Sequence, residues 1–126
     1  MGFADVSKNQ MLDAFTADRV SLHHADPGAA GTANEIDSGT TDYERQTVAW
    51  NAAGAGDTPD GERRNNGAVV FNISGGEGDN SKVAFVGLWL DAGTVFKGSA
   101  QVTEETFGAD GTYTLPDDSG IKLRLT

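Results

Sequence analysis

The chain has 126 residues, with 19 acidic residues against nine lysines and arginines, and its formal net charge is −10. This charge repels phosphate backbones and anionic membrane surfaces, which argues against partners of either kind. The absence of cysteine excludes disulfides and thiolate metal sites. The N-terminus lacks a basic region followed by an apolar run, and no window has the roughly 18 apolar residues of a membrane helix, so we expect a soluble protein without a signal peptide.

The first segment has helical periodicity, and the segments after it alternate. Residues 3–16, FADVSKNQMLDAFT, carry one apolar stripe, which predicts a short N-terminal helix capped by Asp5 or Ser7. Residues 20–24, VSLHH, alternate apolar and polar side chains as a strand does. Residues 26–42 are turn formers and small polar residues, which predict a loop.

Short strands are predicted along the rest of the chain. The segments with strand patterns are YERQTVAW at 43–50, AVVFNI at 68–73, VAFVGLWL at 83–90, VFKGSAQV at 95–102, a stretch around Tyr113 and Leu115, and IKLRL at 121–125. Residues 51–67 are rich in Gly, Asp and Asn and are predicted to be a long loop. Residues 83–90 are apolar on both faces, which is typical of a central strand.

This order of elements predicts a mainly β fold, in the form of an antiparallel β-sandwich (jelly-roll-like) of six to eight strands with a short N-terminal α-helix. Turn signals recur at the intervals found in sandwiches and barrels. Strands and helices do not alternate, which argues against a parallel α/β sheet. We expect a single domain over residues 1–126, with the helix in 1–17 and the sandwich in 18–126.

The stretch SLHHADPGAAGTANE at residues 21–35 contains four side chains of metal-ligating types, two histidines, an aspartate and a glutamate. Neighbouring residues on a strand point to opposite faces, so His23 and His24 should not reach one metal, whereas His24 and Asp26 can share a face. Zinc requires at least three protein ligands, and the chain has no third histidine. We therefore predict no metal site, with His24 and Asp26 as the only candidate ligands, and expect Asp26 to accept hydrogen bonds from the following turn.

A calcium site in the carboxylate-rich loops GGEGDN or EIDSGTTD is an alternative. Neither loop has the alternating ligands and terminal glutamate of an EF-hand loop.

We predict no catalytic or cofactor-binding residues. Ser21 beside His23 lacks the sharp elbow that exposes a nucleophile. The glycines of ISGGEG at 73–78 lack a P-loop lysine and precede a strand. Trp50 and Trp89 would suit a sugar-binding platform, but each lies in an apolar strand, so we expect them to pack in the core.

Several of these segments together resemble small structural proteins of tailed phages that are commonly labelled tail fibre proteins. The resemblance covers roughly residues 5–125, and its most specific parts are Leu22-His23-x-Ala25-Asp26-Pro27-Gly28, Asn34-Glu35, Tyr43 with Arg45 and Gln46, and Gly87-Leu88-Trp89. The chain departs from that pattern at His24, where threonine is common, and at Phe85-Val86, where histidine is common before the glycine. These departures argue against metal binding through the histidines of the family.

The resemblance implies a non-enzymatic structural protein in the virion of a tailed bacteriophage or archaeal virus. It leaves open a surface subunit of the head, as a decoration or turret protein, and a fibre or tip module of the tail. Its partners would be copies of itself in a homo-oligomer and other capsid or tail proteins. The alternatives are a module that binds host-surface glycans and, less favoured, a metal-dependent hydrolase. The acidic composition, with only four lysines, indicates a virus of a halophilic host, because salt screens repulsion between surface carboxylates.

Overall fold

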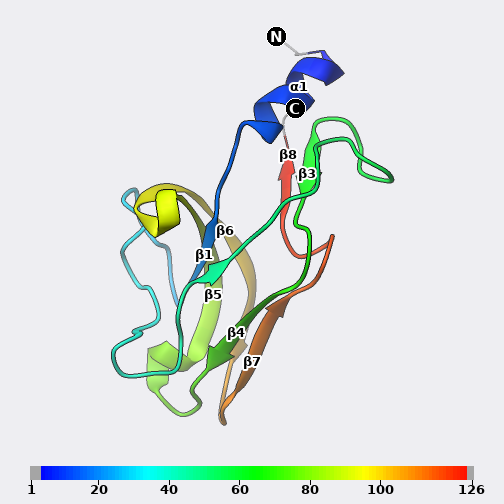
Figure 1. Ribbon diagram of the computed structural model, residues 1–126. Coiled ribbons are helices and arrows are strands. Elements are labelled where there is room, and N and C mark those ends of the chain that lie inside the picture. The colour runs from blue at the N-terminus through cyan, green and yellow to red at the C-terminus, as the bar shows by residue number, and fades with distance from the viewer. Residues whose placement is uncertain (1–3, 125–126) are drawn as a thin grey trace. The chain divides into compact units, whose positions relative to one another are not determined.

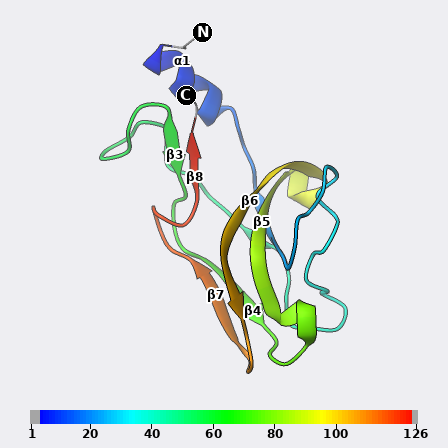
Figure 2. The same ribbon diagram turned by 180° about the vertical axis from the view of Figure 1, so that it is seen from behind.

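The computed structural model describes residues 4–124, which contain one α-helix and eight strands (Figures 1 and 2). The elements are α1 (Asp5–Asp13), β1 (Arg19–His23), β2 (Gln46–Thr47), β3 (Glu62–Arg64), β4 (Val69–Ile73), β5 (Lys82–Leu90), β6 (Val95–Thr106), β7 (Gly111–Leu115) and β8 (Lys122–Arg124). Two 3-10 helices, η1 (Gly78–Ser81) and η2 (Asp91–Gly93), flank β5.

The strands form three sheets. The largest has the order β2-β1-β5-β6, and the pairs β3-β8 and β4-β7 form two smaller sheets. Neighbouring strands run antiparallel throughout the largest sheet and in the β3-β8 pair. The prediction of a mainly β, antiparallel fold with a short N-terminal helix is confirmed.

The chain divides into two compact units, which we call the sheet unit and the helix unit. The sheet unit comprises Ala17–Thr47 and Val70–Tyr113, and the helix unit comprises Met1–Thr16, Val48–Val69 and Thr114–Thr126. The prediction of a single domain over residues 1–126 remains a prediction.

The core of the sheet unit lies between β1, β5 and β4. Its buried apolar side chains include Val20, Leu22, Ile36, Tyr43, Phe71, Ile73, Val83 and Val86. The Tyr43 ring stacks on Phe71 of β4 at a centroid distance of 6.2 Å, and its hydroxyl accepts a hydrogen bond from the Leu22 N–H of β1. Tyr43 thus ties β4 to the largest sheet, which is the contact between two β-layers that a sandwich requires.

Three arginines, Arg63, Arg64 and Arg124, make the main polar contacts of the helix unit. Arg63 donates from Nη1 to the carbonyls of Leu12 and Phe15, at 3.0 and 2.8 Å, and so binds the chain at the C-terminal end of α1. Arg64 and Arg124 both donate to the buried carboxylate of Glu62, each at 2.6 Å.

Three local predictions were wrong. The helix begins at Asp5 with Ala4 as its N-cap, and neither Asp5 nor Ser7 caps it. The segment predicted as a strand over 43–50 forms a strand only at Gln46–Thr47, with one further isolated bridge between Trp50 and Asn65, while Tyr43 and Arg45 make side-chain contacts. The segment 51–67, predicted as a loop, contains strand β3, with the charged sequence Glu-Arg-Arg. Its Glu62 side chain is buried in ion pairs with Arg64 and Arg124.

The last predicted strand, 121–125, is found as β8. Leu125, like Phe3 at the start of the predicted helix, lies outside the described residues. Within residues 4–124, no helix is long and apolar enough to cross a membrane.

Candidate functional site

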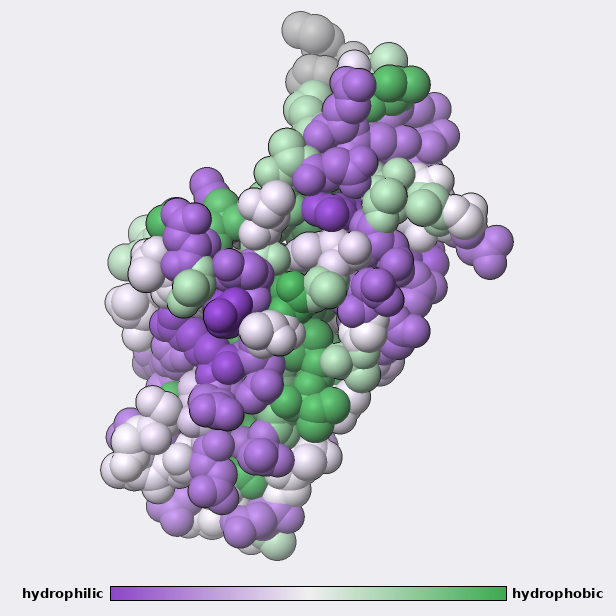
Figure 3. Space-filling model, viewed as in Figure 1, coloured by the Kyte–Doolittle hydropathy of each residue, from purple (hydrophilic) through white to green (hydrophobic). Residues whose placement is uncertain are grey.

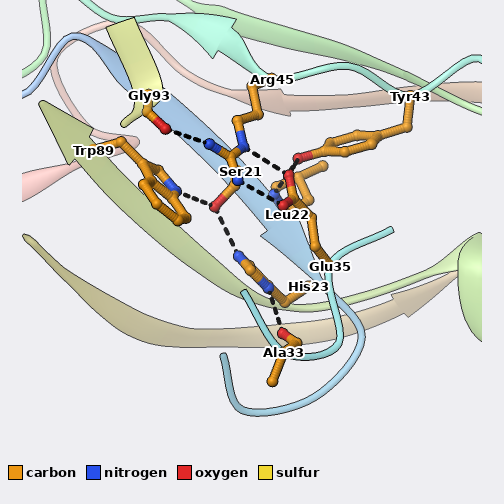
Figure 4. Close-up of polar contacts among 9 residues, drawn as sticks. All are labelled: Ser21, Leu22, His23, Ala33, Glu35, Tyr43, Arg45, Trp89 and Gly93. Atoms are coloured by element: carbon orange, nitrogen blue, oxygen red, sulfur yellow. Dashed lines mark hydrogen bonds and ion pairs between the residues drawn. The ribbon is translucent and has the colours of Figure 1, made fainter. Parts of the chain in front are cut away.

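A chain of hydrogen bonds lies on the face of the largest sheet opposite to Val20 and Leu22 (Figure 4). The Trp89 indole N–H donates to Ser21 Oγ at 2.8 Å, and Ser21 Oγ lies 2.7 Å from His23 Nε2. The other ring nitrogen, His23 Nδ1, lies 2.9 Å from the carbonyl of Ala33. Ser21 and His23 are both fully buried, so this chain is closed to solvent at its centre.

The hydrogen-bond partners of His23 determine which of its ring nitrogens carries the proton. A carbonyl only accepts, so His23 Nδ1 carries the proton that it donates to Ala33. Burial lowers the pKa of His23 below its usual value of 6.5, although the hydrogen bond to Ala33 and the carboxylate of Glu35 oppose this effect. The neutral ring then accepts at Nε2 from the Ser21 hydroxyl, while Ser21 accepts from Trp89. Every polar hydrogen in the chain is thereby used.

A second cluster surrounds the carboxylate of Glu35, whose side chain is 20% exposed. Arg45 donates to both of its oxygens, from Nη2 to Oε1 at 2.8 Å and from Nε to Oε2 at 2.9 Å. The Tyr43 hydroxyl also donates to Oε2, at 2.6 Å. Burial alone would raise the pKa of Glu35, but the bonds from Arg45 and Tyr43 outweigh it and hold that pKa below its usual value.

Arg45 joins the two clusters. Its guanidinium lies over the Trp89 ring, 3.9 Å from the ring centroid, and its Nη1 donates to the carbonyl of Gly93 at 2.8 Å. Trp89 is therefore held on its face by Arg45 and at its N–H by Ser21 (Figure 4). We call these residues (Ser21, His23, Glu35, Tyr43, Arg45 and Trp89) the polar network.

Two glycines make room for this arrangement. Gly87 lies opposite Ser21 in the β1-β5 register, and a Cβ atom there would stand 2.5 Å from Ser21 Oγ. Gly31 has a φ of +76°, and a Cβ atom there would overlap the Phe96 ring. Phe96 in turn packs on Trp89 with a centroid distance of 5.1 Å. Glycine is required at both positions, because a larger side chain would collide with the residues packed around the network.

The candidate metal ligands do not lie in this network. Asp26 is exposed, and its Oδ1 accepts from the Gly28 N–H at 2.8 Å, which confirms the predicted turn contact. His24 lies just beyond the end of β1, and its backbone N–H donates to the Asn34 carbonyl. Across residues 4–124, no group of three or more His, Asp or Glu side chains could hold a metal ion. The prediction of no metal site remains a prediction.

The pairing of Ser21 with His23 was missed from the sequence. Residues two apart on a strand share a face, so this contact could have been expected from the predicted strand. The pair has the geometry of a nucleophile and a base, but Ser21 is fully buried and already bonded to Trp89. The bonds of Ser21 and His23 instead connect β1 to β5, through Trp89, and to the loop that contains Ala33. Trp89 is buried, which confirms its core packing, and Trp50 is half-buried.

A comparison with protein-family models matches residues 3–112 to the family described as Podophage GP4 fiber I protein gp80. No curated protein and no solved structure matches the chain. The matched segment contains the whole polar network, together with every motif that carried the resemblance to tail fibre proteins.

We predict that replacing Glu35 with Gln destabilises the protein by about 2–4 kcal/mol, because Arg45 and the Tyr43 hydroxyl lose a charged acceptor inside the fold. Denaturant unfolding measures this change. The matched control is Glu44→Gln, which neutralises an exposed acid nearby and should cost less than about 0.5 kcal/mol. Equal costs for the two variants would contradict the central role of Glu35.

We also predict that the protein loses stability in two stages on acidification. The pKa of His23 is lower in the folded than in the unfolded chain, so the unfolded state binds more protons as the pH falls below 6.5. The pKa of Glu35 is also lower in the folded state, and its contribution is lost as the pH falls below 4.5. Both shifts favour the folded state at neutral pH relative to acid.

Unfolding free energy measured against pH tests this order. The variant His23→Gln should lack the first stage and retain the second, whereas the control His24→Gln should retain both. An NMR titration of the His23 ring in the wild type provides an independent readout. A midpoint at or above 6.5 would disprove the assignment.

Proposed function

The chain belongs to the Podophage GP4 fiber I protein gp80 family, and from this membership we propose that it is a rigid, non-catalytic subunit of a phage tail fibre. Membership places the protein in the virion, as a structural protein of the fibre type. A fibre protein assembles with itself and with other virion proteins.

The observation that supports the proposal is that the Ser21 and His23 side chains of the polar network are buried and bonded to each other. A catalytic site needs a reactive group that substrate can reach, whereas Ser21 and His23 are fully buried and bonded to each other. The bonds of Glu35 and Arg45 instead tie the loop after β1 and the segment before β2 to η2. This supports a subunit whose task is to keep its shape within a larger assembly.

The exposed surface favours protein contacts over glycan binding. Among residues 4–124, the exposed large apolar side chains are Val6, Met11, Val70 and Val95, and none is aromatic. A glycan platform uses exposed aromatic rings. The family supports a position in the tail, so a head decoration or turret protein gains no support from this membership.

Labelling of purified virions tests the proposal. An antibody against this chain, detected by electron microscopy, should mark the fibres and leave the head unmarked. Virions made without the gene should lack fibre density and keep filled heads. Label on the capsid surface, or fibres that persist without the gene, would overturn the assignment.

We further propose that the acidic surface is an adaptation to high salt. Hydrophilic residues are spread over the face shown in Figure 3, with less polar and hydrophobic residues between them. Repulsion among surface carboxylates raises the free energy of the compact state, and its range falls from about 8 Å at 0.15 M salt to about 3 Å at 1 M. Glu62 is not part of this surface, because it is buried between Arg64 and Arg124.

We predict that the melting temperature rises with salt into the molar range, and rises less in a variant carrying Asp57→Asn, Glu77→Gln and Asp79→Asn, at three exposed acids. A control variant with Asp57→Glu, Glu77→Asp and Asp79→Glu keeps the charge and should behave as the wild type. Excluded salts also strengthen apolar burial, so only the difference between variants is diagnostic. Equal gains per unit of salt in all three proteins would reject surface repulsion as the cause.

A further inference from the structure

Asn66 and Gly67 lie in the segment between β3 and β4, and both residues are exposed. Asn66 is the one asparagine of the sequence that is followed by glycine. The backbone nitrogen after an asparagine can attack the side-chain amide carbon and close a succinimide ring. Glycine favours this attack, because it has no Cβ atom to crowd the nitrogen. The sequence therefore supplies both reacting groups.

The structure holds Gly67 at its N–H and at its carbonyl. The N–H donates to Asp117 Oδ1 at 2.7 Å, and the carbonyl accepts from Asn65 Nδ2 at 2.9 Å. Asn65 is fully buried, and it bonds the carbonyl of Pro116 through Nδ2 and the N–H of Ile121 through Oδ1. All of these residues belong to the helix unit. The reacting nitrogen is thus fixed in position, with its hydrogen directed at a carboxylate.

Asp117 is placed to accept the proton that ring closure releases. An attacking amide nitrogen must lose its hydrogen, and a carboxylate 2.7 Å away is within reach of it as a general base. The hydrogen bond lies in the plane of the peptide group, whereas the attack uses the face of that plane, so the two do not compete. Asp117 is also exposed, so the water that the reaction needs can reach the ring.

The atoms of the reaction balance without an oxidant or a reductant. As the bond from the Gly67 nitrogen to Asn66 Cγ forms, the proton of that nitrogen passes to Asp117. The bond from Cγ to Nδ2 then breaks, and Asp117 returns the proton to the departing nitrogen, which leaves as ammonia. Water opens the succinimide at one of its two carbonyls and gives aspartate or isoaspartate.

We propose that Asn66 is a self-modification site, which the folded chain converts to aspartate or isoaspartate with Asp117 as the base. Each conversion replaces a neutral amide by a carboxylate and adds one negative charge to the formal charge of −10. Isoaspartate also lengthens the main chain between Asn65 and Gly67, so the two bonds that fix Gly67 cannot both persist. The helix unit is therefore altered after it has folded. This reaction is independent of the fibre assignment.

Mass spectrometry of the aged protein tests the proposal. The purified full chain is incubated at neutral pH in water enriched in heavy oxygen, and the peptide that contains Asn66 should lose its amide nitrogen and gain a heavy oxygen atom. Asn72, which is exposed on β4 and followed by isoleucine, should stay unchanged. The folded chain should convert at least about tenfold faster than the same chain unfolded in urea, because unfolding removes the base from the nitrogen.

Variants separate the base from the turn. Asp117→Asn keeps an oxygen that accepts from the Gly67 N–H but is no base, so it should slow the conversion about tenfold. The control Asp57→Asn removes an exposed acid of the same unit and should leave the rate unchanged. Circular dichroism verifies that both variants fold, and the comparison of folded with unfolded wild type needs no variant. Wild type that converts no faster folded than unfolded, or Asp117→Asn that converts at the wild-type rate, would overturn the proposal.

Discussion

The bidentate pair of Glu35 and Arg45 is the interaction on which the arrangement of the sheet unit depends. A carboxylate that is mostly shielded from water is costly unless charged or polar donors surround it. Here Arg45 and Tyr43 supply those donors, and both come from the segment that precedes β2. The requirement to pair one charge therefore fixes the position of an otherwise irregular stretch of chain.

The same ion pair is connected to the largest sheet through the contact between Arg45 and Trp89. The Arg45 guanidinium lies over the Trp89 ring, and Trp89, on β5, donates to Ser21 on the neighbouring strand β1. From there the hydrogen bonds continue through His23 to the loop at Ala33. Each group in this series has a partner on either side, so the loss of one leaves a buried donor or acceptor unsatisfied. Such a network specifies one conformation, which suits a subunit that must fit identical neighbours.

Rigidity in the interior contrasts with exposure at the edge. The largest sheet is closed on one side by short β2 and ends on the other in long, exposed β6. In the helix unit, the buried Glu62 with its two arginines holds β3 to β8 by the same principle of paired charge. Charged residues in this protein thus serve two purposes: a few are buried and paired, and the others form the acidic surface.

The sequence by itself determined the class of fold and most of its strands. Period-two patterns and turn residues predict β4 and β5 closely, because a buried strand must alternate or be apolar throughout. The sequence could not identify β3, because Glu62, Arg63 and Arg64 have the composition of a solvated loop and are stabilised only by distant partners such as Arg124. It also indicated the motif residues of the polar network without indicating their purpose. Glu35, Arg45 and Trp89 are far apart along the chain, and only the tertiary structure decides that one carboxylate, one guanidinium and one indole satisfy each other, since pairing of buried polar groups depends on distance in space.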